Sequence, residues 1–125
     1  MISEKQYNEL IVPEIEKEVE FLDASIYHLD GPGALRHLDR ILEIPGLSGV
    51  QWRYGAGQPS ASHWIPVVKK IQAAGKCVEL EVQAHELETM LKEVAPEGVC
   101  YWITQVKDEA HAEYLMKLVE RYARA

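Results

Sequence analysis

His28 and Asp30 are two potentially reactive side chains separated by one residue in a short β-like run. Alternate residues of a strand share a face, so the imidazole and the carboxylate are predicted on the same side of a sheet. There the pair could act in proton transfer, with the carboxylate fixing the tautomer of the imidazole. A polar network inside a barrel, or a solvated sheet face, is the alternative interpretation. One imidazole and one carboxylate are too few ligands for a first-row metal ion, so we expect no metal site.

Arg53, Glu79 and Glu81 form a second polar group, expected on neighbouring strands. The planar guanidinium could hold an anionic substrate, but we favour an internal ion pair between Arg53 and Glu81. The loop 55–58 could present backbone amides to an anion, yet it lacks a nucleotide-binding signature and is more typical of a tight turn. Other reactive residues are assigned structural roles. We expect Cys77 and Cys100 to be a buried, inert pair near the start of their strands. We expect four histidines to be surface or helix-capping residues: His37, His63, His85 and His111.

Helical and strand-like segments alternate along the whole chain. The strand-like runs are 25–30, 49–54, 77–82 and 99–104, and helices are predicted over 3–22, 34–43, from Ser60 or Ser62 to about Gly75, 85–94 and 108–124. The first helix opens with a capping box from Ser3 to Gln6 and should be interrupted at Pro13. This alternation is typical of βα units that build a parallel sheet.

Each strand-like run is apolar on one face and polar on the other. Val78, Leu80 and Val82 alternate with Glu79 and Glu81. A doubly wound sheet, covered by helices on both sides, would have nearly continuous apolar strands. A complete eight-unit barrel takes about 250 residues. The sequence therefore predicts an α/β fold of four parallel strands, the (βα)4 half of a TIM-type barrel with an extra N-terminal helix.

Composition and charge restrict the class of protein. The 125 residues fit a single domain spanning 1–125, and 20 acidic against 13 basic residues give a net charge of −7. This balance argues against binding to nucleic acid or to an anionic membrane. No apolar run reaches the roughly 20 residues that span a bilayer, and residues 1–6 lack the apolar core of a secretion signal. We therefore expect a cytoplasmic protein.

Two loop motifs resemble a known family. They are YHLDGPGALRHL from Tyr27 to Leu38 and GVQWRYGAGQP from Gly49 to Pro59. Both resemble the uroporphyrinogen decarboxylase superfamily, which includes cobalamin-dependent methyltransferases that pass a methyl group to a thiol. The resemblance covers nearly the whole chain but matches only the C-terminal half of the family's (β/α)8 barrel.

The resemblance places the site at the carboxyl ends of the strands. It implies catalytic roles for His28 and Asp30 and substrate-binding roles for a set of strand-end residues: Arg53, Tyr54, Glu81, Gln83 and Gln105. In the methyltransferase branch a His-x-Cys pair binds zinc, and Asp30 stands here in place of that cysteine. The resemblance implies a tetrapyrrole carboxylate or a methylated corrinoid as ligand, and it leaves the choice between the two chemistries open.

The residues and the resemblance lead to two alternative hypotheses for the function of the chain. In the first, the chain is an enzyme subunit whose half-barrel completes a site by forming a homodimer or by joining a separate N-terminal half-barrel chain, because a half-barrel leaves two sheet edges exposed. In the second, it is a non-catalytic interaction module or a truncated fragment whose polar face is simply solvated.

Overall fold

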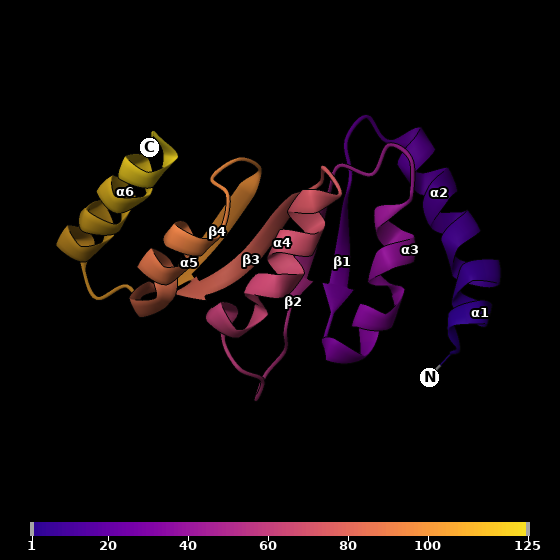
Figure 1. The fold of residues 1–125 in the computed structure, drawn as a ribbon, viewed down its shortest axis with the longest axis horizontal. Coiled ribbons are helices and arrows are strands. Elements are labelled where there is room, and N and C mark those ends of the chain that lie inside the picture. Colours follow the sequence, from indigo (N-terminus) through magenta and orange to yellow (C-terminus); the bar gives the residue numbers. More distant parts are fainter. Residues whose placement is uncertain (1, 125) are drawn as a thin grey trace.

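A four-stranded parallel sheet lies at the centre of the computed structural model, which describes residues 2–124 (Figure 1). Within these residues the strands are β1 (Ile26–Asp30), β2 (Gly49–Arg53), β3 (Cys77–Gln83) and β4 (Val99–Thr104). They lie side by side in chain order, β1-β2-β3-β4, without the reversal of order found in a doubly wound sheet. The predicted α/β class and the half-barrel arrangement of four parallel strands are confirmed.

Each connection between strands contains a 3₁₀ turn that continues into an α-helix. These turns are Pro32–His37 before α3 (Leu38–Leu42), Ala61–Trp64 before α4 (Ile65–Ala73) and Ala84–Glu86 before α5 (Leu87–Glu93). Pro66 lies in the first turn of α4, where its missing N–H leaves no helical hydrogen bond unmade. The last helix, α6 (Glu109–Ala123), begins after Asp108, whose carboxylate accepts a hydrogen bond from the His111 N–H.

The N-terminal helix changes its winding where the sequence predicts an interruption. α1 (Glu4–Gln6) runs into a π-helical turn, Tyr7–Ile11, and α2 (Val12–Phe21) follows. Pro13 occupies the first turn of α2 and cannot donate a backbone hydrogen bond to the preceding turn. The predicted capping box is also present, because the Gln6 N–H donates to Ser3 Oγ while the Ser3 N–H donates to Gln6 Oε1.

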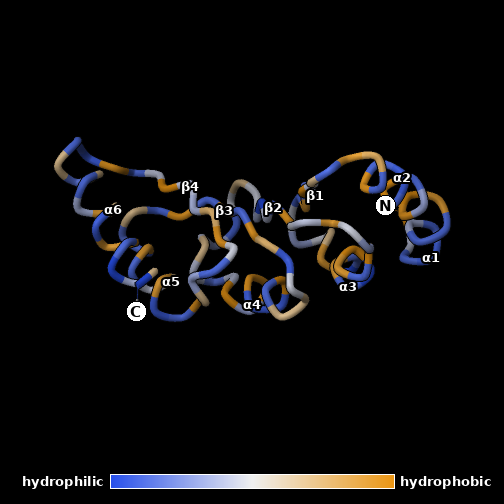
Figure 2. Tube along the Cα trace, turned by 90° about the horizontal axis from the view of Figure 1, so that it is seen from above, coloured by the Kyte–Doolittle hydropathy of each residue, from blue (hydrophilic) through white to orange (hydrophobic). Residues whose placement is uncertain are grey.

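Within residues 2–124, helices cover one face of the sheet and leave the other uncovered. α3, α4 and α5 lie along that face, α1 and α2 lie beyond β1, and α6 lies beyond β4 (Figure 2). The strand residues that face these helices are buried: Leu29, Val50, Trp52, Val78, Leu80 and Val82. Their neighbours along each strand point the other way, to a surface that we call the open face. It is formed by Ile26, His28, Asp30, Gln51, Arg53, Cys77, Glu79, Glu81, Gln83, Cys100, Trp102 and Thr104, which are half-buried or exposed.

The two cysteines belong to the open face, and the prediction that they are a buried pair is wrong. Cys77 and Cys100 are both exposed free thiols. Each lies at a strand position whose side chain points away from the helices, and none of the helices in the described part of the chain covers that side. They are also offset along their strands, since Cys100 aligns with Glu79 rather than with Cys77.

His37 is buried, which corrects its assignment to the surface. Its ring stacks on Tyr7 with the centroids 3.8 Å apart, and only 7% of the residue is exposed. Burial lowers the pKa of His37, and the neighbouring Arg36 lowers it further. The N-terminal helix therefore covers a residue that belongs to the first crossover connection.

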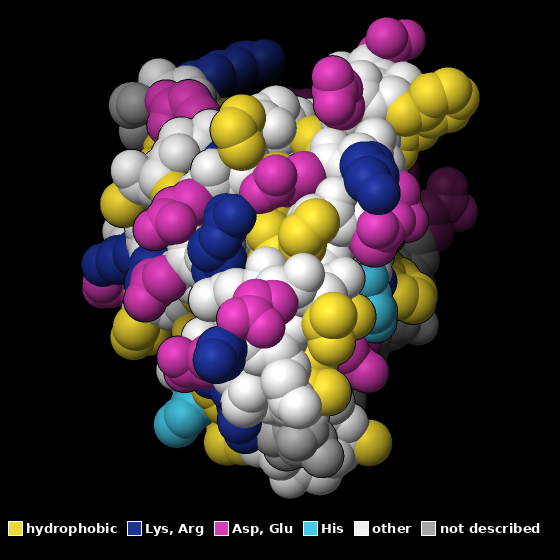
Figure 3. All heavy atoms as spheres, turned by 90° about the vertical axis from the view of Figure 1, so that its right-hand side faces the viewer, with side chains coloured by type: hydrophobic (Ala, Val, Ile, Leu, Met, Phe, Trp, Pro, Cys, Tyr) yellow, Lys and Arg dark blue, Asp and Glu magenta, His cyan; other side chains and the backbone are white. Residues whose placement is uncertain are grey.

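The surface beyond β1 mixes charged and apolar side chains. Acidic and basic groups alternate there with separate apolar residues (Figure 3). Leu10, Phe21 and Leu22 in the N-terminal segment are exposed, Phe21 to 87%. Within residues 2–124, none of the helices combines the length and the apolar composition that crossing a bilayer requires.

Candidate functional site

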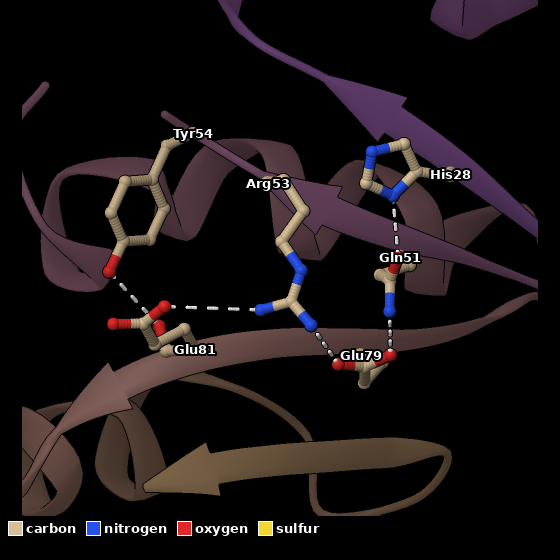
Figure 4. A network of polar contacts seen from close by, with 6 residues as sticks. All are labelled: His28, Gln51, Arg53, Tyr54, Glu79 and Glu81. Atoms are coloured by element: carbon tan, nitrogen blue, oxygen red, sulfur yellow. Dashed lines mark hydrogen bonds and ion pairs between the residues drawn. The ribbon is translucent and has the colours of Figure 1, made fainter. Parts of the chain in front are cut away.

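A chain of hydrogen bonds crosses three strands on the open face (Figure 4). The strand register aligns His28 with Gln51 and Gln51 with Glu79. His28 Nδ1 lies 2.6 Å from Gln51 Oε1, and Gln51 Nε2 donates to Glu79 Oε2. The other oxygen of Glu79 accepts a hydrogen bond of 2.9 Å from Arg53 Nη2. The open face thus carries an ordered polar network rather than independent solvated side chains.

The direction of these hydrogen bonds determines what His28 can do. The amide oxygen of Gln51 can only accept, so His28 Nδ1 donates and carries a proton. In the neutral ring the Nε2 lone pair is then left for a ligand on the open face. Asp30 lies on the same face two residues along, as predicted. Within residues 2–124, no hydrogen bond or ion pair joins it to His28, and Gln51 orients the imidazole instead.

Arg53 is held by two carboxylates and one aromatic ring. Its guanidinium lies 2.9 Å from Glu79 and 3.9 Å from Glu81, and its carbon is 4.8 Å from the centre of the Trp102 ring. The predicted contact with Glu81 is present, but the shorter ion pair is with Glu79. Two carboxylates therefore surround one guanidinium, and the immediate surroundings of Arg53 have an excess of negative charge.

A cavity of about 440 Å³ adjoins this network at the carboxyl ends of β2 and β3. Four of the predicted substrate-binding residues line it together with the loop 55–58 and Ser60: Arg53, Tyr54, Glu81 and Gln83. The Tyr54 hydroxyl donates to the Glu81 carbonyl oxygen at 3.3 Å. Burial raises the pKa of Tyr54, and the charges of Glu81 and Glu86 add to this effect. The hydroxyl therefore stays protonated and can donate a hydrogen bond at neutral pH.

The loop that borders this cavity is a tight turn. Gly55 and Gly57 have φ values of 96° and 79°, a region that favours glycine, and the Gln58 N–H donates to the Gly55 carbonyl oxygen.

The other predicted site residues lie outside this first cavity. Gln105 lines a separate cavity at the ends of β3 and β4, and neither of these two cavities includes His28 or Asp30 in its lining.

Glu86 is a buried carboxylate that the sequence analysis did not identify. Its Oε1 atom accepts hydrogen bonds from Ser60 Oγ at 2.6 Å, Ser62 Oγ at 2.8 Å and Ser62 N at 3.0 Å. The Gln83 N–H donates to Oε2 at 3.3 Å. Burial by itself would raise the pKa of Glu86, but the four hydrogen bonds to the charged form hold it below its ordinary value.

This carboxylate positions two residues that line the cavity, Ser60 and Gln83. The Ser60 and Ser62 hydroxyls, expected to cap the following helix, donate to Glu86 instead. The Gln83 side chain and Glu86 also form a reciprocal cap at the start of the next connection. The Gln83-x-x-Glu86 spacing resembles a capping box and was the available signal in the sequence.

Two further observations concern possible metal ligands in the described residues and the similarity of the chain to known proteins. Among residues 2–124, no three or more His, Cys, Asp and Glu side chains are grouped so that they could hold a metal ion. Comparison of the chain with models of known families, with curated proteins and with solved structures gives no match in any of the three.

Proposed function

We propose that this chain is one half of a uroporphyrinogen decarboxylase-like barrel and gains its functional site by pairing with a second half-barrel. The observation that carries the proposal is the open face, where an ordered polar network lies on a sheet surface that the helices of residues 2–124 leave uncovered. In a closed barrel this surface would be the interior, and the cavity at the strand ends would become part of the site.

The two outer strands supply the physical reason for pairing. Within residues 2–124, β1 has a strand neighbour only in β2, and β4 only in β3. Each outer edge therefore presents backbone donors and acceptors to which another sheet can add. Two half-barrels joined at both edges give the eight strands of a complete barrel. A second copy of this chain, or a separate N-terminal half-barrel chain, could supply the other half.

The open face suits a large flat ligand such as a tetrapyrrole or a corrinoid. Trp102 is 56% exposed and lies over Arg53, so a macrocycle could stack against its outer face. His28 Nε2 would accept a proton from such a ligand, and Asp30 would face the same space. The two carboxylates near Arg53 disfavour an acidic ligand at that position, so basic groups from the second half would have to hold its carboxylates.

A non-catalytic interaction module is the second candidate function. One observation favours it, because the Arg53 guanidinium lies 2.9 Å from Glu79 and 3.9 Å from Glu81, so that two carboxylates of the chain itself offset its charge. Residues 28, 51, 53 and 79 would then stabilise a polar docking surface and carry out no chemistry.

The first experiment measures the mass of the purified chain in solution by size exclusion with light scattering. We expect twice the chain mass of 14.2 kDa. Ile26 is 52% exposed at the beginning of β1, so Ile26→Glu should dissociate the dimer without unfolding the chain. Leu10→Glu is the control, because Leu10 is 64% exposed on the N-terminal helix, away from the sheet. Equal masses for the two variants would contradict pairing through the sheet.

The second experiment titrates the dimer with hydroxocobalamin and, separately, with coproporphyrin, and follows quenching of tryptophan fluorescence. We expect saturable binding that Trp102→Ala and His28→Ala weaken, whereas Arg121→Ala on α6 leaves it unchanged. A monomer that binds neither probe would refute the site formed by a homodimer, and the search would then turn to a separate N-terminal half-barrel chain.

A further inference from the structure

The second cavity lies at the carboxyl ends of β3 and β4 and differs from the first, whose lining includes both Arg53 and Glu81. It encloses about 320 Å³ and is lined by Ala84, His85, Gln105, Lys107 and His111. Three of its five lining residues carry basic side chains and none is acidic. This composition is unusual in a chain with a net charge of −7, in which acidic residues outnumber basic ones.

Lys107 supplies a cation that none of the carboxylates in residues 2–124 approaches within 4 Å. Lys5, Lys17, Lys69, Lys70 and Lys92 each have a carboxylate oxygen within 4 Å, at 3.9, 2.9, 3.7, 2.6 and 3.3 Å. Within residues 2–124, the Lys107 ammonium has no such partner. Its neighbour Asp108 is the N-cap of α6, where one oxygen of that carboxylate accepts the His111 N–H at 2.7 Å. The ammonium group is therefore available to an external anion.

His111 and Gln105 supply N–H donors to the same cavity. The Lys107 N–H donates to His111 Nδ1 at 3.1 Å, so the neutral ring carries its proton on Nε2, which is left to donate to a ligand. Gln105 has a φ of 60°, an uncommon conformation for a residue other than glycine. Its amide group can donate two hydrogen bonds. The cavity thus combines one cation with imidazole and amide donors from three segments of the chain.

We infer that this cavity binds a small oxyanion, the carboxylate or phosphate group of a ligand, through Lys107, His85, His111 and Gln105. A charged ammonium and several N–H donors around one small space are the groups that hold such anions, and charge-assisted hydrogen bonds are the stronger kind. Arg53, neutralised by two glutamates, is a poorer anion receptor than this cluster. The inference concerns the isolated chain and does not depend on half-barrel pairing.

The test is an NMR titration of the ¹⁵N-labelled chain with inorganic phosphate and, separately, with acetate, at constant ionic strength set by chloride. We expect saturable shifts of the amide resonances of residues 105–111. Tighter binding of phosphate would indicate a phosphorylated ligand, and equal or tighter binding of acetate would indicate a carboxylate ligand. The absence of saturable shifts with both anions would overturn the inference.

Matched variants distinguish binding of the anion in this cavity from non-specific attraction of the anion to positive charge. Lys107→Gln should weaken binding about tenfold, the loss expected when one charge-assisted hydrogen bond worth about 1.4 kcal/mol is removed. Lys117→Gln makes the same charge change at an exposed position of α6 and should leave binding unchanged. His85→Ala, at an exposed residue, provides a second variant that should weaken binding and leave the fold intact. Equal weakening by Lys107→Gln and Lys117→Gln would show non-specific attraction and refute the site.

Discussion

Replacing Glu86 by glutamine tests whether a buried charge positions the cavity at the ends of β2 and β3. The glutamine oxygen can keep the three hydrogen bonds made to Oε1, but as neutral bonds. Its NH₂ group would face the Gln83 N–H, so the fourth bond would be lost. A bond to a charged group contributes about 1.5–3 kcal/mol and a neutral one about 0.5–1.5. Because burial is less costly for the neutral amide, we expect a net loss of about 2 kcal/mol.

Urea denaturation at pH 7 measures this loss. With a denaturant slope of about 1.5 kcal/mol/M, Glu86→Gln should lower the unfolding midpoint by about 1.3 M. The matched control is Glu113→Gln, which changes the same chemical group at an exposed position of α6. A surface substitution of this kind should alter stability by less than about 0.5 kcal/mol. Equal midpoints for Glu86→Gln and the wild type would refute the structural role of the carboxylate.

The pH dependence provides a second check with a definite sign. The hydrogen bonds hold the pKa of Glu86 below its ordinary value in the folded chain. Its stabilisation is therefore complete above the unfolded pKa of about 4.3 and is lost as the pH falls through the lower, folded pKa. The gap between wild type and Glu86→Gln should be largest near pH 7 and should shrink below about pH 4. A gap that widens on acidification would contradict this reasoning.

Three further predictions concern packing and the N-terminal helix. A methyl group on Gly49 would lie 2.7 Å from a carbonyl oxygen of β3, so Gly49→Ala should lower the free energy of unfolding by about 2–3 kcal/mol. Gly57→Ala, in open space at positive φ, should cost about 1 kcal/mol; similar urea midpoints for the two would refute the close approach. Tyr7→Phe removes a 2.7 Å hydrogen bond to the Tyr27 hydroxyl and should cost about 1 kcal/mol, seen as a lower Tm; an unchanged Tm would count against that bond. Because burial lowers the pKa of His37, stability should fall as the pH drops below about 6.5, and His37→Phe should flatten that slope in urea titrations between pH 7 and 5; an unaltered slope would refute the assignment.

The fold was largely predictable because its main signals are local. Strict alternation in the third strand, with Leu80 between Glu79 and Glu81, shows which face is buried without knowledge of any other segment. The interruption at Pro13 also follows from the chemistry of a single residue. The 3₁₀ turns within each connection were not predicted, because the short turn and the α-helix share nearly the same dihedral angles and apolar spacing.

The candidate site was only partly predictable. Parallel strands of known order bring their carboxyl ends together, so the sequence placed Arg53, Tyr54, Glu81 and Gln83 in one region, and they line one cavity. The sequence could not predict which of these side chains form hydrogen bonds or ion pairs with one another. Arg53 makes its shorter contact with Glu79, and Gln51 instead of Asp30 orients His28. The choice depends on register and on the reach of each side chain across neighbouring strands.

The sequence by itself determined the alternation of strands and helices, the polar face of the sheet and the position of the helix interruption. Only the tertiary structure decided which polar residues are buried. Glu86 and His37 are buried because segments 24 or more residues away pack over them, the serines on one side and the N-terminal helix on the other. Cys77 and Cys100 are exposed because the helices in the described part of the chain all lie away from their face of the sheet. A side chain is buried when a second segment of the chain packs over it. The residue pattern of one segment does not show which other segment will do so.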